Sequence, residues 1–269
     1  MPMTSSSTAR SPRLHHTLRE ARSGHATPRT FLLSHALGCD LSMWDGLADH
    51  LAQEHRVVCY DQRGHGQSEA PTGPYTMAEL ADDAARLIDE LALGPVTWIG
   101  LSMGGMIGQE LALRHPAKVQ ALVLANTTSG YPQEAQAGWD QRIATIEQAG
   151  LEAMVDGALL RWFHDDFRAR HPDVVAHWRE RVLRCDVGGY IACCQAIKAL
   201  DTTERLPGIS APTLVIAGAL DLGTPPAMAQ RIAEQVPGAK LVVLDEASHL
   251  SVLEQPQAFA QALDAWLSA

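Results

Sequence analysis

The pentapeptide Gly100-Leu101-Ser102-Met103-Gly104 constrains this chain more than any other feature of its sequence. The run before it, residues 96–99, is β-branched and aromatic, as in a buried strand, and residues 106–115 have a helical pattern that ends at Pro116. A sharp turn between the two would hold the serine hydroxyl at the carboxyl end of a sheet. The glycines suit this turn because its strained backbone leaves no room for side chains two residues before and after the serine. We therefore predict that Ser102 is a nucleophile.

An acid that serves this serine is expected further along the chain. A serine hydroxyl needs a base to take its proton, and the base needs an acid to orient it. In a strand–turn–helix serine site, the acid comes after the serine and before the histidine. Asp221 follows residues 213–218, which read as a late strand, whereas Asp245 and Glu246 adjoin the histidine loop and are expected to be solvated. We predict that Asp221 is the acid.

The base is predicted from position rather than from residue type. The chain has 12 histidines, so a histidine alone carries little information. His249 differs from the others because it follows the last apolar run, residues 241–244, and precedes the last helical pattern. We therefore predict a catalytic triad of Ser102, Asp221 and His249.

Attack on an ester carbonyl creates an oxyanion that needs fixed N–H donors. One donor is the amide of the residue after the nucleophile, Met103, and the second comes from the loop after an early strand. Residues 32–34 end that strand, and the loop reads His35-Ala36-Leu37-Gly38. We predict that the Leu37 and Met103 backbone N–H groups form the oxyanion hole.

A second glycine-rich loop, Asp61-Gln62-Arg63-Gly64-His65-Gly66-Gln67-Ser68, follows an apolar run. Such a loop could cradle a phosphate, but this one lacks the Gly-Lys-Ser/Thr ending of a P-loop. We therefore interpret it as structural, with Asp61 and Arg63 fixing its shape.

Strand-like runs alternate with helical patterns along most of the chain, which predicts an α/β fold with a mostly parallel central sheet and helices on both faces. The expected strands are residues 30–34, 56–60, 96–100, 119–125, 213–218 and 240–244, and the expected helices are 44–53, 76–91, 103–115, 225–235 and 256–267. The Ser/Thr/Arg-rich first dozen residues are expected to be loose.

Residues 127–206 break this alternation. They contain three of the six tryptophans, helical patterns at 137–149 and 151–162, and no convincing strand. We predict a helical cap inserted after a central strand, which divides the chain into a first core part (1–126), the cap (127–206) and a second core part (207–269).

The composition narrows the class of protein. The net charge is −10 and no basic run is present, which argues against nucleic-acid binding. No apolar stretch is long enough to span a membrane, and residues 1–25 lack the apolar segment of a secretory signal. The five cysteines lack metal-site spacing, and two of them, Cys193 and Cys194, are neighbours, so free thiols in a reducing cytoplasm are expected.

Taken together, these residues resemble the α/β-hydrolase fold superfamily and, within it, the 3-oxoadipate enol-lactone hydrolases of aromatic catabolism. The core stretches are shared by many hydrolases, whereas those of the predicted cap are closer to the lactonases. The stretches that carry the resemblance are residues 34–44, 60–66, 73–76, 100–106, 126–127, 161–163 and 189–194. Where this family typically has Ser-Asn-Ser-Leu-Gly, the present chain has Ser-His-Ala-Leu-Gly at 34–38.

The resemblance implies a serine hydrolase that opens the ring of an anionic enol-lactone through an acyl-enzyme on Ser102, without a metal or an organic cofactor. Because burying the substrate carboxylate unpaired is costly, a cation in the cap is expected. Arg161 and Arg142 are the candidates, and Trp162 is a candidate for the pocket wall.

Two other classes of function stay open. One is a different hydrolase of this fold, such as a carboxylesterase or a carbon–carbon bond hydrolase of ring-cleavage products. The other is a ligand receptor with little turnover, against which the presence of Ser102, Asp221 and His249 argues.

Overall fold

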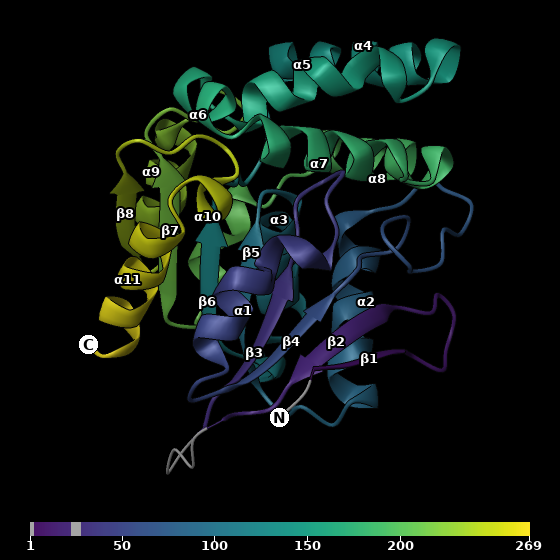
Figure 1. Cartoon of the computed structure of the whole chain (residues 1–269). Coiled ribbons are helices and arrows are strands. Elements are labelled where there is room, and N and C mark those ends of the chain that lie inside the picture. The colour runs from purple at the N-terminus through teal and green to yellow at the C-terminus, as the bar shows by residue number, and fades with distance from the viewer. Residues whose placement is uncertain (1–2, 23–27) are drawn as a thin grey trace.

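The protein is built around an eight-stranded sheet with the strand order β1-β2-β4-β3-β5-β6-β7-β8 (Figure 1). The computed structural model describes residues 3–22 and 28–269. Strands β3 to β8 pair in parallel, whereas β1 and β2 run antiparallel to their neighbours. The mostly parallel α/β sheet predicted from the sequence is thus confirmed. The strands are β1 (Thr4–Ser7), β2 (His15–Arg19), β3 (Thr30–Ser34), β4 (Arg56–Tyr60), β5 (Val96–Leu101), β6 (Val119–Ala125), β7 (Thr213–Gly218) and β8 (Lys240–Leu244).

Helices cover both faces of the sheet. The helices α1 and α11 pack together on one face, and α2 and α3 pack together on the other, where α9 also contacts β7 and β8 (Figure 1). Central strands read as nearly continuous apolar runs because both of their faces are buried. The core helices are η1 (Leu41–Trp44), α1 (Asp45–Leu51), α2 (Met77–Glu90), α3 (Met103–Arg114), η2 (Pro116–Lys118), α9 (Pro226–Gln235), α10 (Ser251–Glu254) and α11 (Pro256–Leu267).

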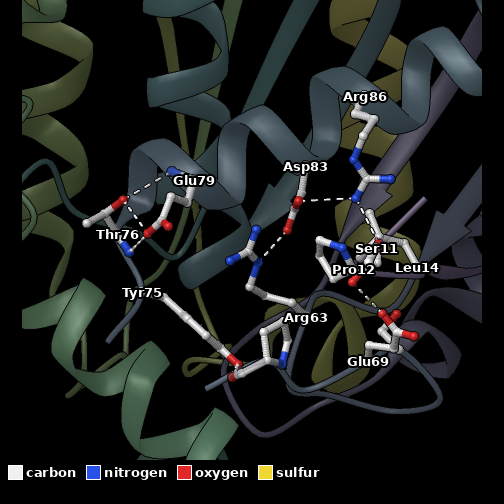
Figure 2. Close-up of polar contacts among 12 residues, drawn as sticks. Ser11, Pro12, Leu14, Arg63, Glu69, Tyr75, Thr76, Glu79, Asp83 and Arg86 are labelled. Carbon is white, nitrogen blue, oxygen red and sulfur yellow. Dashed lines mark hydrogen bonds and ion pairs between the residues drawn. The ribbon is translucent and has the colours of Figure 1, made fainter. Parts of the chain in front are cut away.

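The start of α2 shows how local sequence sets a helix boundary. Thr76 precedes the helix, and its Oγ1 accepts a hydrogen bond of 3.2 Å from the Glu79 N–H. The Glu79 carboxylate accepts in return from the Thr76 N–H at 2.8 Å, which completes a capping box (Figure 2). The sequence placed the helix start at Thr76, and the structure shows Thr76 as its cap.

Between β6 and β7 the chain, which is described throughout this stretch, forms five α-helices and a 3-10 helix. The five α-helices lie together over the carboxyl ends of the parallel strands (Figure 1), whereas the 3-10 helix contacts α3 and α9. Helix α5 packs against α4 and α7, and α4 packs against α8. These elements are α4 (Gln133–Ala149), α5 (Glu152–Trp162), α6 (Asp165–Arg170), α7 (Pro172–Leu183), α8 (Val187–Lys198) and η3 (Thr203–Gly208).

The expectation of a loose first dozen residues was wrong for residues 4–7, while residues 1–2 lie outside the described part of the chain. Residues Thr4–Ser7 form strand β1, which pairs antiparallel with β2. All four residues of β1 are exposed. The strand therefore carries no apolar alternation, and its backbone pairing with β2 holds it in place.

The glycine-rich loop at 61–68 is fixed by its own charged residues. Arg63 donates to Asp83 on α2 at 2.5 Å, and its guanidinium lies 5.1 Å from the centre of the Tyr75 ring (Figure 2). Asp61 accepts from the Leu41 N–H at 2.8 Å and from the Gln67 N–H at 2.9 Å. These contacts agree with the structural interpretation of the loop.

Candidate active site

Ser102 sits in the turn between β5 and α3, in a backbone conformation that side chains rarely adopt. Its φ is +55° and its ψ is −114°. A Cβ at Gly100 would lie 2.1 Å from the Gly104 carbonyl oxygen, and a Cβ at Gly104 would lie 2.0 Å from that of Ser34. Both distances are far below van der Waals contact, so the turn accepts only glycine at these two positions.

The structure brings together the three residues predicted for the triad. The Ser102 Oγ lies 2.9 Å from His249 Nε2, and His249 Nδ1 lies 2.9 Å from Asp221 Oδ2. With the Nδ1–H donated to the carboxylate, Nε2 is free to accept the serine proton. Asp245 and Glu246 are exposed, as the sequence analysis expected.

Asp221 is held as a carboxylate by its surroundings. One oxygen accepts from the backbone N–H groups of Gly223 and Thr224, and the other accepts from the Asn126 amide and the Thr224 hydroxyl. Burial acts to raise the pKa of Asp221, but the His249 ring, the Asn126 amide and the Thr224 N–H outweigh it and lower that pKa. Asp221 is therefore ionised at neutral pH and can stabilise an imidazolium.

Asn126 is a site residue that the sequence analysis quoted without giving it a role. Its amide nitrogen lies 2.9 Å from Asp221 Oδ2 and 3.0 Å from the Ser248 carbonyl oxygen. Its amide oxygen accepts from the Ser251 hydroxyl at 2.5 Å. Its φ is +45°, in the left-handed region that asparagine tolerates better than most residues. Asn126 thus joins the acid to the histidine loop.

Glu254, the last residue of α10, connects the same loop to the inserted helices. The sequence analysis gave it no role. Its side chain is buried, and one oxygen accepts from the Ser248 N–H. The other accepts from the His164 N–H at 2.9 Å. Nearby, the Leu250 N–H donates to the Trp162 carbonyl oxygen at 3.1 Å. The end of α5 is therefore attached to the loop that carries His249.

The loop predicted to supply the second oxyanion donor lies against the elbow. The Gly104 N–H donates to the His35 carbonyl oxygen at 3.1 Å, which ties α3 to this loop. Among the described residues, no acceptor is recorded for the Leu37 N–H. Met103 is the first residue of α3, where an N–H has no acceptor within its own helix.

Two buried histidines shape that loop. His65 Nε2 accepts from the Gly38 N–H at 2.9 Å, and His35 Nε2 accepts from the Gln62 N–H at 3.0 Å. Both rings must stay neutral to accept these bonds. Burial lowers the pKa of His65 to about 3 and also lowers the pKa of His35.

A cavity of about 490 Å³ opens over Ser102 and His249 between the core and the inserted helices. Tyr190, on α8, is 1% exposed, and within the described part of the chain its hydroxyl has no recorded hydrogen-bond partner. The cavity wall includes Leu37, Ser102, Met106, Tyr131, Trp139, Arg142, Met154, Arg161, Trp162, Tyr190, Leu222 and His249.

The two arginines in this wall face each other without an acidic partner. Arg142 lies on α4, with its guanidinium 4.9 Å from the centre of the Trp139 ring. Arg161 lies near the end of α5, and its pKa is lowered by burial and by the charge of Arg142. Neither forms an ion pair with any residue that the structure describes. A site with two such cations suits an anionic ligand.

The described residues offer neither a metal site nor a membrane-spanning helix. No group of three or more His, Cys, Asp or Glu side chains is placed to hold a metal ion. Nor does any described helix combine the length and the apolar character needed to cross a membrane.

Comparisons with known proteins agree with this geometry. Residues 29–256 match the model of the family described as alpha/beta hydrolase fold. The chain is 38% identical to 3-oxoadipate enol-lactonase 2 of Acinetobacter baylyi, over 92% of each chain. It superposes on the crystal structure of the enol-lactonase from Burkholderia xenovorans LB400 with a TM-score of 0.92 and 37% identity, covering 99% of this chain and 100% of that one. It is also 31% identical to a putative carbamate hydrolase, RutD, of Agrobacterium fabrum, over 86% and 89% of the two chains.

Proposed function

Because this chain belongs to the 3-oxoadipate enol-lactonases of the α/β-hydrolase fold family, we propose that it opens the ring of 3-oxoadipate enol-lactone to give 3-oxoadipate. The chain is a carboxylic ester hydrolase by this membership. The observation that supports the finer assignment is the pair of unpaired arginines above Ser102 and His249 in one cavity. The enol-lactone carries one carboxylate beside the ester that reacts.

The proposed first step is attack on the ring carbonyl. Ser102 Oγ bonds to the carbonyl carbon while His249 Nε2 takes its proton, and Asp221 stabilises the imidazolium that results. The Leu37 and Met103 N–H groups hold the oxyanion. Collapse breaks the ring C–O bond and releases an enolate. The proton that His249 took from Ser102 passes to this leaving group, whose protonation at carbon gives the ketone, and His249 is neutral again.

The proposed second step releases the acid. The ring oxygen belongs to the same molecule as the acyl group, so the opened chain stays on Ser102 as one ester. Water that gives its proton to His249 attacks this ester, and the serine leaves with a proton from the same ring. None of these steps calls for a metal or an organic cofactor.

We assign the substrate carboxylate to the cap side of the cavity. Arg142 and Arg161 supply the charge, and the Tyr190 hydroxyl, which has no hydrogen-bond partner among the described residues, is a third donor. Trp162, buried at the end of α5, forms part of the wall. In this proposal residues 127–206 act as a cap that selects the substrate, and the core parts 1–126 and 207–269 supply the chemistry.

The first test is the ultraviolet decay of enzymatically generated 3-oxoadipate enol-lactone. We expect rapid loss with the wild type and none above background with Ser102→Ala. Cleavage of p-nitrophenyl acetate without loss of the lactone would retain the triad and overturn the lactone assignment. Because one relative is a putative carbamate hydrolase, ammonia release from a carbamate is the next activity to measure in that case.

The carboxylate assignment has its own test. We expect Arg142→Met with Arg161→Met to raise KM for the enol-lactone by more than tenfold, because a buried charge-assisted hydrogen bond contributes about 1.5–3 kcal/mol. The neutral ester p-nitrophenyl acetate serves as the control, and its kcat/KM should change by less than about threefold on the same scale. Equal losses on both substrates would contradict a role in carboxylate binding.

We also propose a cytoplasmic location. The five cysteines are all described, buried and free, which suits a reducing compartment. As the binding partner we propose a small anionic lactone, and we propose neither a nucleic acid nor a membrane.

A further inference from the structure

A second Ser–His–Asp chain of contacts lies outside the catalytic cavity. The Ser5 Oγ lies 2.8 Å from His15 Nε2, and His15 Nδ1 lies 2.8 Å from Asp61 Oδ2. The atoms are connected in the same order as in the catalytic triad, where both distances are 2.9 Å. The fold supplies the three residues from strands β1 and β2 and from the loop after β4.

The His–Asp half of this second chain is as enclosed as that of the catalytic triad. The His15 and Asp61 side chains are 8% and 2% exposed, against 8% and 0% for His249 and Asp221. Two backbone N–H groups, from Leu41 and Gln67, also donate to the Asp61 carboxylate. An ionised Asp61 requires His15 to donate its Nδ1–H, so Nε2 is left to accept the Ser5 hydroxyl proton.

The backbone holds this geometry firmly. The Asp61 N–H donates to the His15 carbonyl oxygen at 2.9 Å, and the His15 N–H donates to the Ser68 hydroxyl at 2.9 Å. Ser68 in turn donates to the Asp61 carbonyl oxygen at 2.6 Å. The histidine and the acid are therefore fixed relative to each other before any reagent arrives.

The two serines differ in access. Ser5 lies on the exposed edge strand β1, whereas Ser102 is buried under the inserted helices. Beside His15 and Asp61 is a cavity of about 300 Å³ that Arg181 and Arg184 also line. Arg181 is paired with Asp40 at 2.8 Å, and Arg184 forms no ion pair with the residues the structure describes. Ser5 does not line this cavity, but its exposure on β1 leaves it open to reagents from solvent.

We propose that Ser5, His15 and Asp61 form a second serine relay, which makes Ser5 a site of covalent acylation by activated esters and fluorophosphonates. With p-nitrophenyl acetate, Ser5 Oγ bonds to the carbonyl carbon and the bond from that carbon to the p-nitrophenolate oxygen breaks. The serine proton passes to His15 Nε2 and then to solvent. The products are O-acetyl-Ser5, p-nitrophenolate and one proton. With a fluorophosphonate, Ser5 Oγ bonds to phosphorus and the P–F bond breaks, so the products are the phosphonylated serine, fluoride and one proton.

This relay is expected to be acylated once rather than to turn over. Ser102 lies in an elbow with N–H groups at the start of a helix, whereas Ser5 lies in a regular strand. Without such preorganised donors, both acylation and deacylation lose the electrostatic part of their catalysis. The product to look for is therefore a stable adduct.

The experiment uses the full-length Ser102→Ala variant, so that its outcome does not depend on the lactonase proposal. The variant is treated with a fluorophosphonate and, separately, with p-nitrophenyl acetate, and the adduct is located by intact mass and peptide mapping. We expect one adduct per chain, on Ser5, formed at least tenfold faster than any adduct on Ser7. Ser7 is the matched control because it lies two residues along the same exposed strand.

Three double variants decide whether the relay is responsible. Adding Ser5→Ala or His15→Gln to Ser102→Ala should remove the adduct, whereas adding Ser7→Ala should leave it, with thermal unfolding confirming that all four proteins are folded. The proposal is overturned if Ser102→Ala gains no adduct at Ser5. It is equally overturned if folded His15→Gln protein labels at an unchanged rate, since Ser5 would then react without its histidine.

Discussion

At the scale of single residues, Asn126 shows how much of the site depends on a side chain that performs no chemistry. It donates to the acid of the triad and to the carbonyl oxygen of Ser248, next to the histidine. Asn126→Asp replaces the amide N–H donor with a carboxylate oxygen. That oxygen would face two other acceptors, the Asp221 carboxylate and the Ser248 carbonyl oxygen. We expect kcat/KM to fall about 10- to 100-fold, as for a lost charge-assisted hydrogen bond of about 1.5–3 kcal/mol.

The pH profile separates this positioning role from a general loss of stability. A second carboxylate beside Asp221 favours the charged imidazolium of His249, so the acid limb of the kcat/KM profile should move to higher pH. Asn126→Asp measured from pH 5 to 8 against the wild type tests this, with unfolding by urea as the check on folding. A reduced rate with an unmoved acid limb would argue against the role.

The sequence could predict that the three residues of the proposed triad lie together because each one follows a readable strand. Ser102, Asp221 and His249 come after β5, β7 and β8, and parallel strands bring their carboxyl ends to one edge. The sequence predicted no role for Asn126 and Glu254, because both act through hydrogen bonds to residues far away in the chain. Ser251, for example, is 125 residues from Asn126. Such contacts have no local sequence signal.

At the scale of elements, the turn between β5 and α3 is constrained by how closely α3 approaches the loop after β3. We expect Gly104→Ala to reduce the free energy of unfolding by several kcal/mol or to prevent folding, because its Cβ would lie 2.0 Å from a carbonyl oxygen. Gly46→Ala in α1 is the control, since a Cβ there meets nothing within 4 Å. It should stabilise the protein slightly, by up to about 1 kcal/mol. Urea unfolding of both variants measures the difference, and similar values for the two would contradict the close approach.

Two of the elements that the sequence did not predict, β1 and α6, have identifiable physical reasons. Strand β1 has only exposed polar residues, so pairing with β2 stabilises it without any apolar alternation. Helix α6 is only six residues long, too short for a helical period to be recognised. In contrast, the long amphipathic α2 begins and ends within one residue of its expected limits. Sequence pattern therefore predicts α2, whose own residues bury a face over 14 residues, and misses β1 and α6, which offer too few such residues.

At the scale of the whole molecule, the two histidines beneath the predicted oxyanion loop make stability depend on pH. His65 and His35 are buried and accept backbone N–H bonds, which only the neutral ring can do. The pKa of His65 is lowered from 6.5 to about 3, so between these values the unfolded chain binds a proton that the folded chain does not. The free energy of unfolding therefore falls as the pH falls below about 6.5, by about 1.4 kcal/mol per pH unit for each such histidine.

Urea unfolding between pH 7 and 4.5 tests this prediction. Asp221 and Asp61 also have lowered pKa values, but they change the free energy of unfolding only near and below pH 3.8, where the unfolded chain takes up their protons. The buried histidines therefore dominate the pH dependence of stability between pH 7 and 4.5. His65→Gln keeps an acceptor for the Gly38 N–H but cannot take up a proton. It should lower the slope of the free energy of unfolding against pH by the contribution of one histidine, about 1.4 kcal/mol per pH unit. An unchanged slope in this variant would mean that His65 is protonated in the folded protein. A charged His65 ring could not accept the Gly38 N–H, so the oxyanion loop would have to be held by other contacts.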